Sequence, residues 1–120
     1  MSERGPTPFE CANPILHVAD MARSVRYYVD VLGFANAAWA GETFTMVTRG
    51  GAAIYLAKPD DAVSRAWVWI GVEDVRVLHN EYTGSGATIL QPPEQHPWAW
   101  EMEVADPDGH VLRFGSGPDA

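Results

Sequence analysis

The chain has 120 residues, of which 47% are hydrophobic and 20% charged, proportions that are typical of one soluble globular domain. Its formal net charge of −8 argues against nucleic-acid binding, because an acidic protein repels phosphates. The one cysteine, Cys11, excludes an internal disulfide and favours a reduced, cytoplasmic setting. Neither the N-terminus nor any later stretch has the apolar run of a signal peptide or a membrane span, so we expect no membrane partner.

The first half of the chain predicts an N-terminal arm, a strand, a helix and three further strands. Residues 1–13 are polar and contain proline, and residues 15–19 form a short apolar run. Asp20 is a typical helix N-cap, apolar residues recur after it at helical spacing, and Gly33 suits the C-terminal cap. Three strands are then predicted between glycine-containing turns, over residues 34–40, 43–48 and 52–57.

The same pattern then repeats. A strand is predicted over 66–72, and Asp74 caps a helix over 75–83 that ends at Gly84-Ser-Gly86. The closing strands are predicted over residues 87–90, 97–105 and 110–115. Asp20 and Asp74 are separated by the same number of residues as Tyr28 and Tyr82, as expected for an internal repeat. We therefore predict an α+β fold, one domain over 1–120, with βαβββ modules over about 13–58 and 66–115 whose sheets curl around a cleft.

Two stretches resemble the vicinal oxygen chelate superfamily, which includes glyoxalase I, extradiol dioxygenases, fosfomycin resistance proteins and bleomycin resistance proteins. HVADMARSVRYYVDVLGF, residues 17–34, is similar to the family's first strand–helix unit. EVADPDGHVLRFG, residues 103–115, is similar to its closing hairpin. The resemblance covers nearly all of residues 13–115 and implies the fold but no single activity, because the family hosts both enzymes and binding proteins.

Metal-dependent relatives place His, Gln or Glu at four positions in the cleft. The resemblance maps these positions onto Asn13, Tyr55, Trp67 and Arg113, with the register at Tyr55 open by one or two residues. Asn13 is a weak ligand, tyrosine is rarely one, and tryptophan and arginine do not bind metal cations. We therefore expect no metal and no cofactor, which argues against glyoxalase, dioxygenase and epimerase chemistry. The resemblance then favours the bleomycin-resistance-like branch of metal-free homodimers, which hold cytotoxic compounds in aromatic and acidic clefts.

Side chains alternate along a strand, so the family positions indicate which faces line the cleft. Trp67 and Trp69 share the inner face, where they would form a stacking wall; core packing is the alternative interpretation. Arg113 also faces inward, and a three-residue turn that pairs Asp106 with His110 puts Glu103 opposite Arg113. The alternative for Arg113 and Glu103 is an ordinary cross-strand ion pair at a wet surface.

The predicted ligand-binding set is completed by Tyr55, Glu101, Trp39 and Phe44. Tyr55 and Glu101 are assigned to the inner face. Trp39 and Phe44 lie near a strand turn, where core packing is the alternative. Trp98 and Trp100 are assigned to the core or to a dimer interface, and His110, directly after a turn, is expected at the surface.

Two functions stay open, and both use the same residues. In the first, the protein sequesters a planar, cationic aromatic antibiotic or natural product, stacked on Tyr55, Trp67 and Trp69 and attracted by Glu101 and Glu103. In the second, a metal-free enzyme uses Glu101 or Glu103 as a base, its pKa raised by apolar walls. A metalloenzyme with ligands elsewhere, such as His17, is a third. The family resemblance implies a homodimer with ligand clefts near its interface and an N-terminal arm that crosses to the partner.

Overall fold

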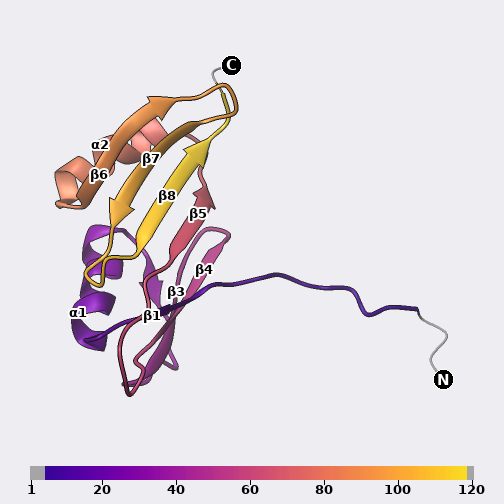
Figure 1. Cartoon of the computed structure of the whole chain (residues 1–120), viewed down its shortest axis with the longest axis vertical. Helices are drawn as coiled ribbons and strands as arrows, with labels where there is room; N and C mark the ends of the chain where they lie inside the picture. The colour runs from indigo at the N-terminus through magenta and orange to yellow at the C-terminus, as the bar shows by residue number, and fades with distance from the viewer. Residues whose placement is uncertain (1–4, 119–120) are drawn as a thin grey trace.

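The computed structural model describes residues 5–118, which form short strands and helices in two successive halves (Figure 1). The first half contains β1 (Ile15–His17), α1 (Met21–Arg26), the π-helical segment η1 (Tyr27–Val31), β2 (Ala35–Asn36), β3 (Phe44–Arg49) and β4 (Ala52–Ala57). The second half contains β5 (Trp67–Gly71), α2 (Val75–Ser85), β6 (Thr88–Gln95), β7 (Trp100–Ala105) and β8 (Val111–Ser116). No helix among these residues is long and apolar enough to cross a membrane.

Each half folds into a four-stranded mixed sheet with the same topology. The strand orders are β1-β4-β3-β2 and β5-β8-β7-β6, and in each sheet the first strand pairs in parallel with the last one of its module. Both helices lie on the left of the molecule in Figure 1, so each sheet has one face toward a helix and one open face. The predicted α+β fold of two βαβββ modules is confirmed.

The hydrophobic core lies between the helices and the sheets and contains residues of both modules. Tyr28 and Tyr82, which the internal repeat predicts to be equivalent, are both fully buried. Leu112 and Phe114 are buried as well, and their neighbour Arg113 therefore points to the open face of the second sheet. The alternation along β8 thus confirms the predicted division between core and open face.

The predicted helix starts are confirmed, and so are the glycines predicted to end the two helices. Asp20 and Asp74 accept hydrogen bonds from backbone N–H groups in the first turns of their helices, at 3.1 and 2.9 Å. Gly33 follows the first helix with φ 80°, as predicted. Helix α2 runs two residues beyond the predicted residue 83, and Gly86, within the predicted Gly84-Ser-Gly86 end, caps it with φ 87°, where its N–H donates to the Tyr82 carbonyl.

The strand boundaries differ from the predictions where turns and prolines intervene. Only Ala35–Asn36 of the strand predicted over 34–40 forms, because a turn follows in which the Ala40 N–H donates to the Ala37 carbonyl. Strand β6 runs on to Gln95 instead of ending at residue 90. It tolerates Pro92 and Pro93 because it is the edge strand of its sheet and its pairing with β7 is irregular there.

The turn between β7 and β8 fastens the second module onto the first. The Asp106 N–H donates to the His110 carbonyl, and Gly109 has φ 83°, which confirms the predicted turn. Asp108, at the tip of this turn, reaches the first module. Its carboxylate accepts hydrogen bonds from the Ala19 N–H, the Arg23 guanidinium and the Ser24 hydroxyl, all within 3.0 Å.

His110 is fully buried, so the prediction that it lies at the surface is wrong. Its Nδ1 accepts a hydrogen bond from the Ala66 N–H at 2.9 Å, which leaves Nε2 to donate to the His17 carbonyl at 2.6 Å. The ring thereby joins β1 of the first module to the residue before β5 of the second. Its burial follows from the packing of one module on the other, which the turn sequence alone does not reveal.

Candidate functional site

The open face of the second sheet presents the two tryptophans of β5. Trp67 and Trp69 are 63% and 57% exposed, whereas Val68 and Ile70 between and beside them face the core. The alternative interpretation, that both tryptophans pack in the core, is therefore wrong. Two large aromatic side chains one residue apart on an open face form an exposed apolar surface of the kind that marks an interaction site.

Glu101 on β7 lies behind Trp69 and is only 6% exposed. The Trp69 indole Nε1–H donates to its Oε2 at 2.8 Å. The Arg113 guanidinium donates to its Oε1 from Nη2 at 2.7 Å and from Nε at 3.1 Å. Both carboxylate oxygens of Glu101 are thus occupied by groups of the open face, and the residue acts as an anchor for them.

These contacts determine the protonation of Glu101. Burial raises its pKa, but the hydrogen bonds from Trp69 and Arg113 and the positive charge of Arg113 outweigh burial, so the pKa lies below its ordinary value. The prediction that apolar walls raise the pKa of Glu101 is therefore wrong. An ionised, fully hydrogen-bonded carboxylate is a poor general base, which removes Glu101 from the candidates for that role.

The predicted register of the β7–β8 hairpin is confirmed, because Glu103 lies directly opposite Arg113. The main ion-pair partner of Arg113 is nevertheless Glu101 and not Glu103, whose Oε2 is 3.6 Å from Arg113 Nη1. Glu101 lies opposite Gly115, two residues along β8 from Arg113, so the Arg113 side chain reaches Glu101 diagonally across the hairpin. Glu103 remains half-buried beside it.

The open face of the first sheet has its own row of aromatic side chains. Tyr55 stacks on Phe44 with ring centroids 5.2 Å apart, and Phe44 stacks on Trp39 at 6.1 Å. Trp39 is 55% exposed and Phe44 39%, so the alternative that they pack in the core is wrong. Tyr55 pairs with Met46 on β3 and with Ile15 on β1, and its side chain lies on the open face because its neighbours Ile54 and Leu56 are buried.

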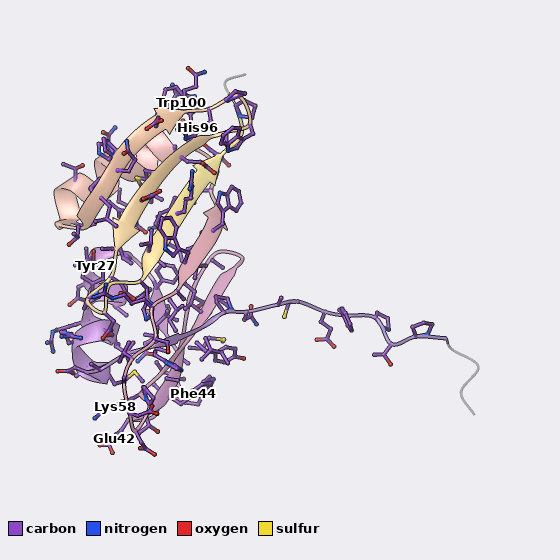
Figure 2. All side chains as sticks on the ribbon, viewed as in Figure 1. Tyr27, Glu42, Phe44, Lys58, His96 and Trp100 are labelled. Atoms are coloured by element: carbon purple, nitrogen blue, oxygen red, sulfur yellow. The ribbon has the colours of Figure 1, made fainter. Side chains whose placement is uncertain are left out.

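These two aromatic rows lie on separate parts of the molecule. Phe44 of the first module and His96 of the second are well apart in Figure 2. The structure has a cavity of about 570 Å³ between the β3–β4 turn and α2, and one of about 600 Å³ beside the start of α1. None of the eight predicted ligand-binding residues lines either cavity. Within one chain, the aromatic members of this set lie on the open faces of two different sheets.

The four positions that correspond to family metal ligands are dispersed over the chain. Asn13 lies in the exposed arm, where its side-chain amide donates to the Cys11 sulfur at 3.5 Å. Tyr55 lies on the first open face, and Trp67 and Arg113 on the second. Between residues 5 and 118, no group of three or more His, Cys, Asp or Glu side chains is arranged to hold a metal ion.

Three further residues border the second open face. The His96 ring stacks on Trp98 with centroids 4.7 Å apart, and its Nε2 is 3.7 Å from Glu101 and 4.0 Å from Glu94. Trp98 is 63% exposed, so it does not pack in the core, and the other predicted place for it, a dimer interface, stays a prediction. Sequence reasoning missed Glu94 because the Pro-Pro pair concealed the continuation of β6, which places Glu94 opposite Glu101. Trp100, in contrast, packs against the core as expected.

The two packed βαβββ modules and their aromatic open faces indicate which protein family the chain belongs to. The chain belongs to the glyoxalase/bleomycin resistance protein/dioxygenase superfamily, whose family model matches residues 11–114. The resemblance read from the sequence is thereby confirmed. No curated protein matches the chain.

Several solved structures share the fold over almost the whole chain. The bleomycin-binding protein of Streptomyces verticillus, solved with copper(II)-bleomycin, is 26% identical with a TM-score of 0.78, over 93% of this chain and 99% of its own. TioX from Micromonospora sp. ML1 is 23% identical with a TM-score of 0.78, over 91% and 99%. TnmS3, an antibiotic-binding protein from Streptomyces sp. CB03234, is 20% identical with a TM-score of 0.79, over 93% and 99%.

Proposed function

We propose that this protein binds and sequesters a planar aromatic antibiotic or natural product without changing it chemically. The observation that carries the proposal is the pair of exposed indole rings, Trp67 and Trp69, on the open face of the second sheet. A flat ring stacked on an indole removes apolar surface of both from water and gains a favourable ring–ring geometry. Two proteins of similar structure are described as binding bleomycin and an antibiotic, which agrees with this class of ligand.

The charges around the tryptophans favour a cationic ring. Arg113 neutralises Glu101, so that carboxylate is not free to attract a ligand. Glu103 and Glu94 remain as half-buried and exposed carboxylates on the same side of the sheet. The faces of indole rings attract cations, and the two carboxylates add to this attraction.

We further propose that the working form is a homodimer in the cytoplasm, with ligand clefts between open faces of different chains. Residues 5–13 are exposed throughout and extend away from the rest of the chain (Figure 1), and the Phe9 side chain is 99% exposed. A second copy would cover this arm and the apolar side chains of both open faces. Each cleft would then combine the Tyr55 row of one chain with the Trp67 and Trp69 surface of the other.

A tryptophan-fluorescence titration tests the function. The panel contains flat cationic antibiotics, flat neutral ones and small anionic metabolites. We expect saturable quenching by the flat cations and loss of about tenfold in affinity in Trp67→Ala. Val77→Ala, which removes an exposed apolar side chain from α2, is the matched control and should bind as wild type does. Quenching by small anions alone would contradict the proposal.

A metal-free enzyme is the second candidate, with Glu103 as its base, because Trp69 and Arg113 already occupy both carboxylate oxygens of Glu101. Arg113 Nη1 lies 3.6 Å from Glu103 and could stabilise a developing anion beside it. Chemical recovery of the bound compound separates the two functions. An unchanged compound supports sequestration, and a converted compound supports the enzyme.

A further inference from the structure

The Trp69 indole lies flat against the backbone of the sheet, over a strip that has no side chains. A Cβ built on Gly115 of β8 would lie 2.5 Å from Trp69 Cζ2, and one built on Gly71 would lie 3.2 Å from Cζ3. Neither glycine has a positive φ, so neither is required by its backbone conformation. Because Gly115 has no side chain, it leaves the space that the Trp69 ring occupies. Real Cβ atoms do not approach another atom so closely, and an indole could not lie in this place beside any other residue at 115.

The far edge of the same ring is held by a hydrogen bond. Trp69 on β5 and Glu101 on β7 are separated by β8, and the indole crosses β8 at Gly115 to reach Glu101 at 2.8 Å. Glu101 is itself held by two hydrogen bonds from Arg113 and is almost fully buried. The ring is therefore supported from below by glycine backbone and anchored at its Nε1 edge, while 57% of the residue stays exposed.

We infer that Gly115 is a positioning residue that makes Trp69 a pre-oriented stacking platform, with Glu101 as its anchor. This inference rests on the proposed function and deepens it. A side chain that is already ordered loses little conformational entropy when a ligand stacks on it, so the orientation contributes to affinity. Because the Nε1–H is engaged by Glu101, the indole offers the ligand its π face and no hydrogen-bond donor. The platform therefore selects flat, electron-poor or cationic rings by stacking.

The decisive variant is Gly115→Ala, and the probe is ethidium, a flat aromatic cation. The added Cβ meets the movable end of an exposed side chain, so we expect the indole to swing away and the fold to survive, which a thermal melt checks. Ethidium affinity should fall about tenfold. Gly117→Ala is the matched control, because a Cβ there meets nothing within 4 Å, and it should bind as wild type does.

A double-mutant cycle shows whether Gly115 acts through Trp69. In a Trp69→Ala background, Gly115→Ala should cause no further loss of ethidium affinity. A loss that persists in that background would overturn the inference, as would wild-type affinity in Gly115→Ala alone. In either case, binding of ethidium by wild type would leave the proposed function standing.

A second readout needs no ligand. The indole N–H resonance of Trp69, identified by its disappearance in Trp69→Phe, should exchange slowly with solvent while it is bonded to Glu101. Gly115→Ala should accelerate the exchange of this resonance and leave the other indole signals unchanged. If wild type binds none of the flat compounds, the proposed function fails, and this exchange rate still decides whether the platform exists. Equal exchange in the two proteins would overturn the platform.

Discussion

Glu101 holds two side chains of the open face, Trp69 and Arg113, although its own side chain is buried. A carboxylate in the middle of an acidic face would repel the other carboxylates, yet here it is buried and its charge is balanced by Arg113. Burying a charge without partners is costly, and the hydrogen bonds from Trp69 and Arg113 offset that cost. The groups of this face that remain for a ligand are therefore the indole rings and the carboxylates of Glu103 and Glu94.

The lowered pKa of Glu101 predicts a pH-dependent contribution to stability. A carboxyl group whose pKa is lower in the folded state stabilises the fold at neutral pH, and this contribution is lost as the pH falls through the folded-state pKa. Glu101→Gln should therefore lower the free energy of unfolding by about 2 kcal/mol at pH 7. Urea unfolding at a series of pH values checks this. The difference from wild type should shrink as the pH falls below the ordinary pKa of a glutamate and through the lower folded-state pKa, and a difference that does not change with pH would contradict the assignment.

At the scale of elements, the β7–β8 turn does more than reverse the chain. Asp106 and Asp108 are turn-forming residues by type, but their carboxylates bond across to the first module. The Tyr28 hydroxyl donates to Asp106 at 2.8 Å, and the side chain of Asp108 is only 3% exposed. The side chains of Asp106 and Asp108 thus connect the β7–β8 turn of the second sheet to the first helix; we call this pair the clasp.

Removal of the negative charge of Asp108 should weaken the contact between the two modules. In Asp108→Asn the fold loses the ion pair to Arg23 and weakens the hydrogen bonds to Ala19 and Ser24. We expect the free energy of unfolding to fall by about 1–3 kcal/mol, measured by urea denaturation. Asp60→Asn, at an exposed loop position, is the control and should stay within about 0.5 kcal/mol of wild type. Equal stability of the two variants would count against the clasp.

At the scale of the whole molecule, a single chain leaves many large apolar side chains exposed. Large hydrophobic side chains are exposed on the arm, on both open faces and on a few edges, namely Phe9, Ile15, Trp39, Phe44, Trp67, Trp69, Val77, Leu90 and Trp98. Isolated exposed apolar residues are ordinary, but adjoining ones on an open sheet face are not. This distribution is the reason to expect that a second copy covers part of the surface.

The arm offers a direct test of the dimer. Deletion of residues 1–13 should shift the protein from dimer to monomer, or weaken the dimer at least about tenfold, because residues 5–13 are exposed in the single chain and would be covered by a second copy. Sedimentation equilibrium over a range of concentrations measures the shift. Phe9→Ala should weaken the dimer less than the deletion does, and Val77→Ala should leave it unchanged. A wild-type protein that sediments as a monomer at every concentration would refute the dimer.

The predictions that held were local ones. The caps Asp20 and Asp74, the turn at Gly109 and the shared face of Trp67 and Trp69 all depend on residues that are neighbours in the chain or alternate along a strand. The division into one domain over 1–120 stays a prediction. The strand boundaries that failed, after residue 36 and after residue 90, depend on a turn between Ala37 and Ala40 and on pairing with β7.

The sequence by itself determined the superfamily, the two modules and the register that puts Glu103 opposite Arg113. Only the tertiary structure decided that Trp39 and Phe44 are exposed, that His110 is buried and that Trp69 reaches across Gly115 to Glu101. The physical reason is that periodicity states which residues share a face, whereas burial depends on what covers that face. Side-chain contacts across three strands depend in addition on the space that a residue on the middle strand leaves open.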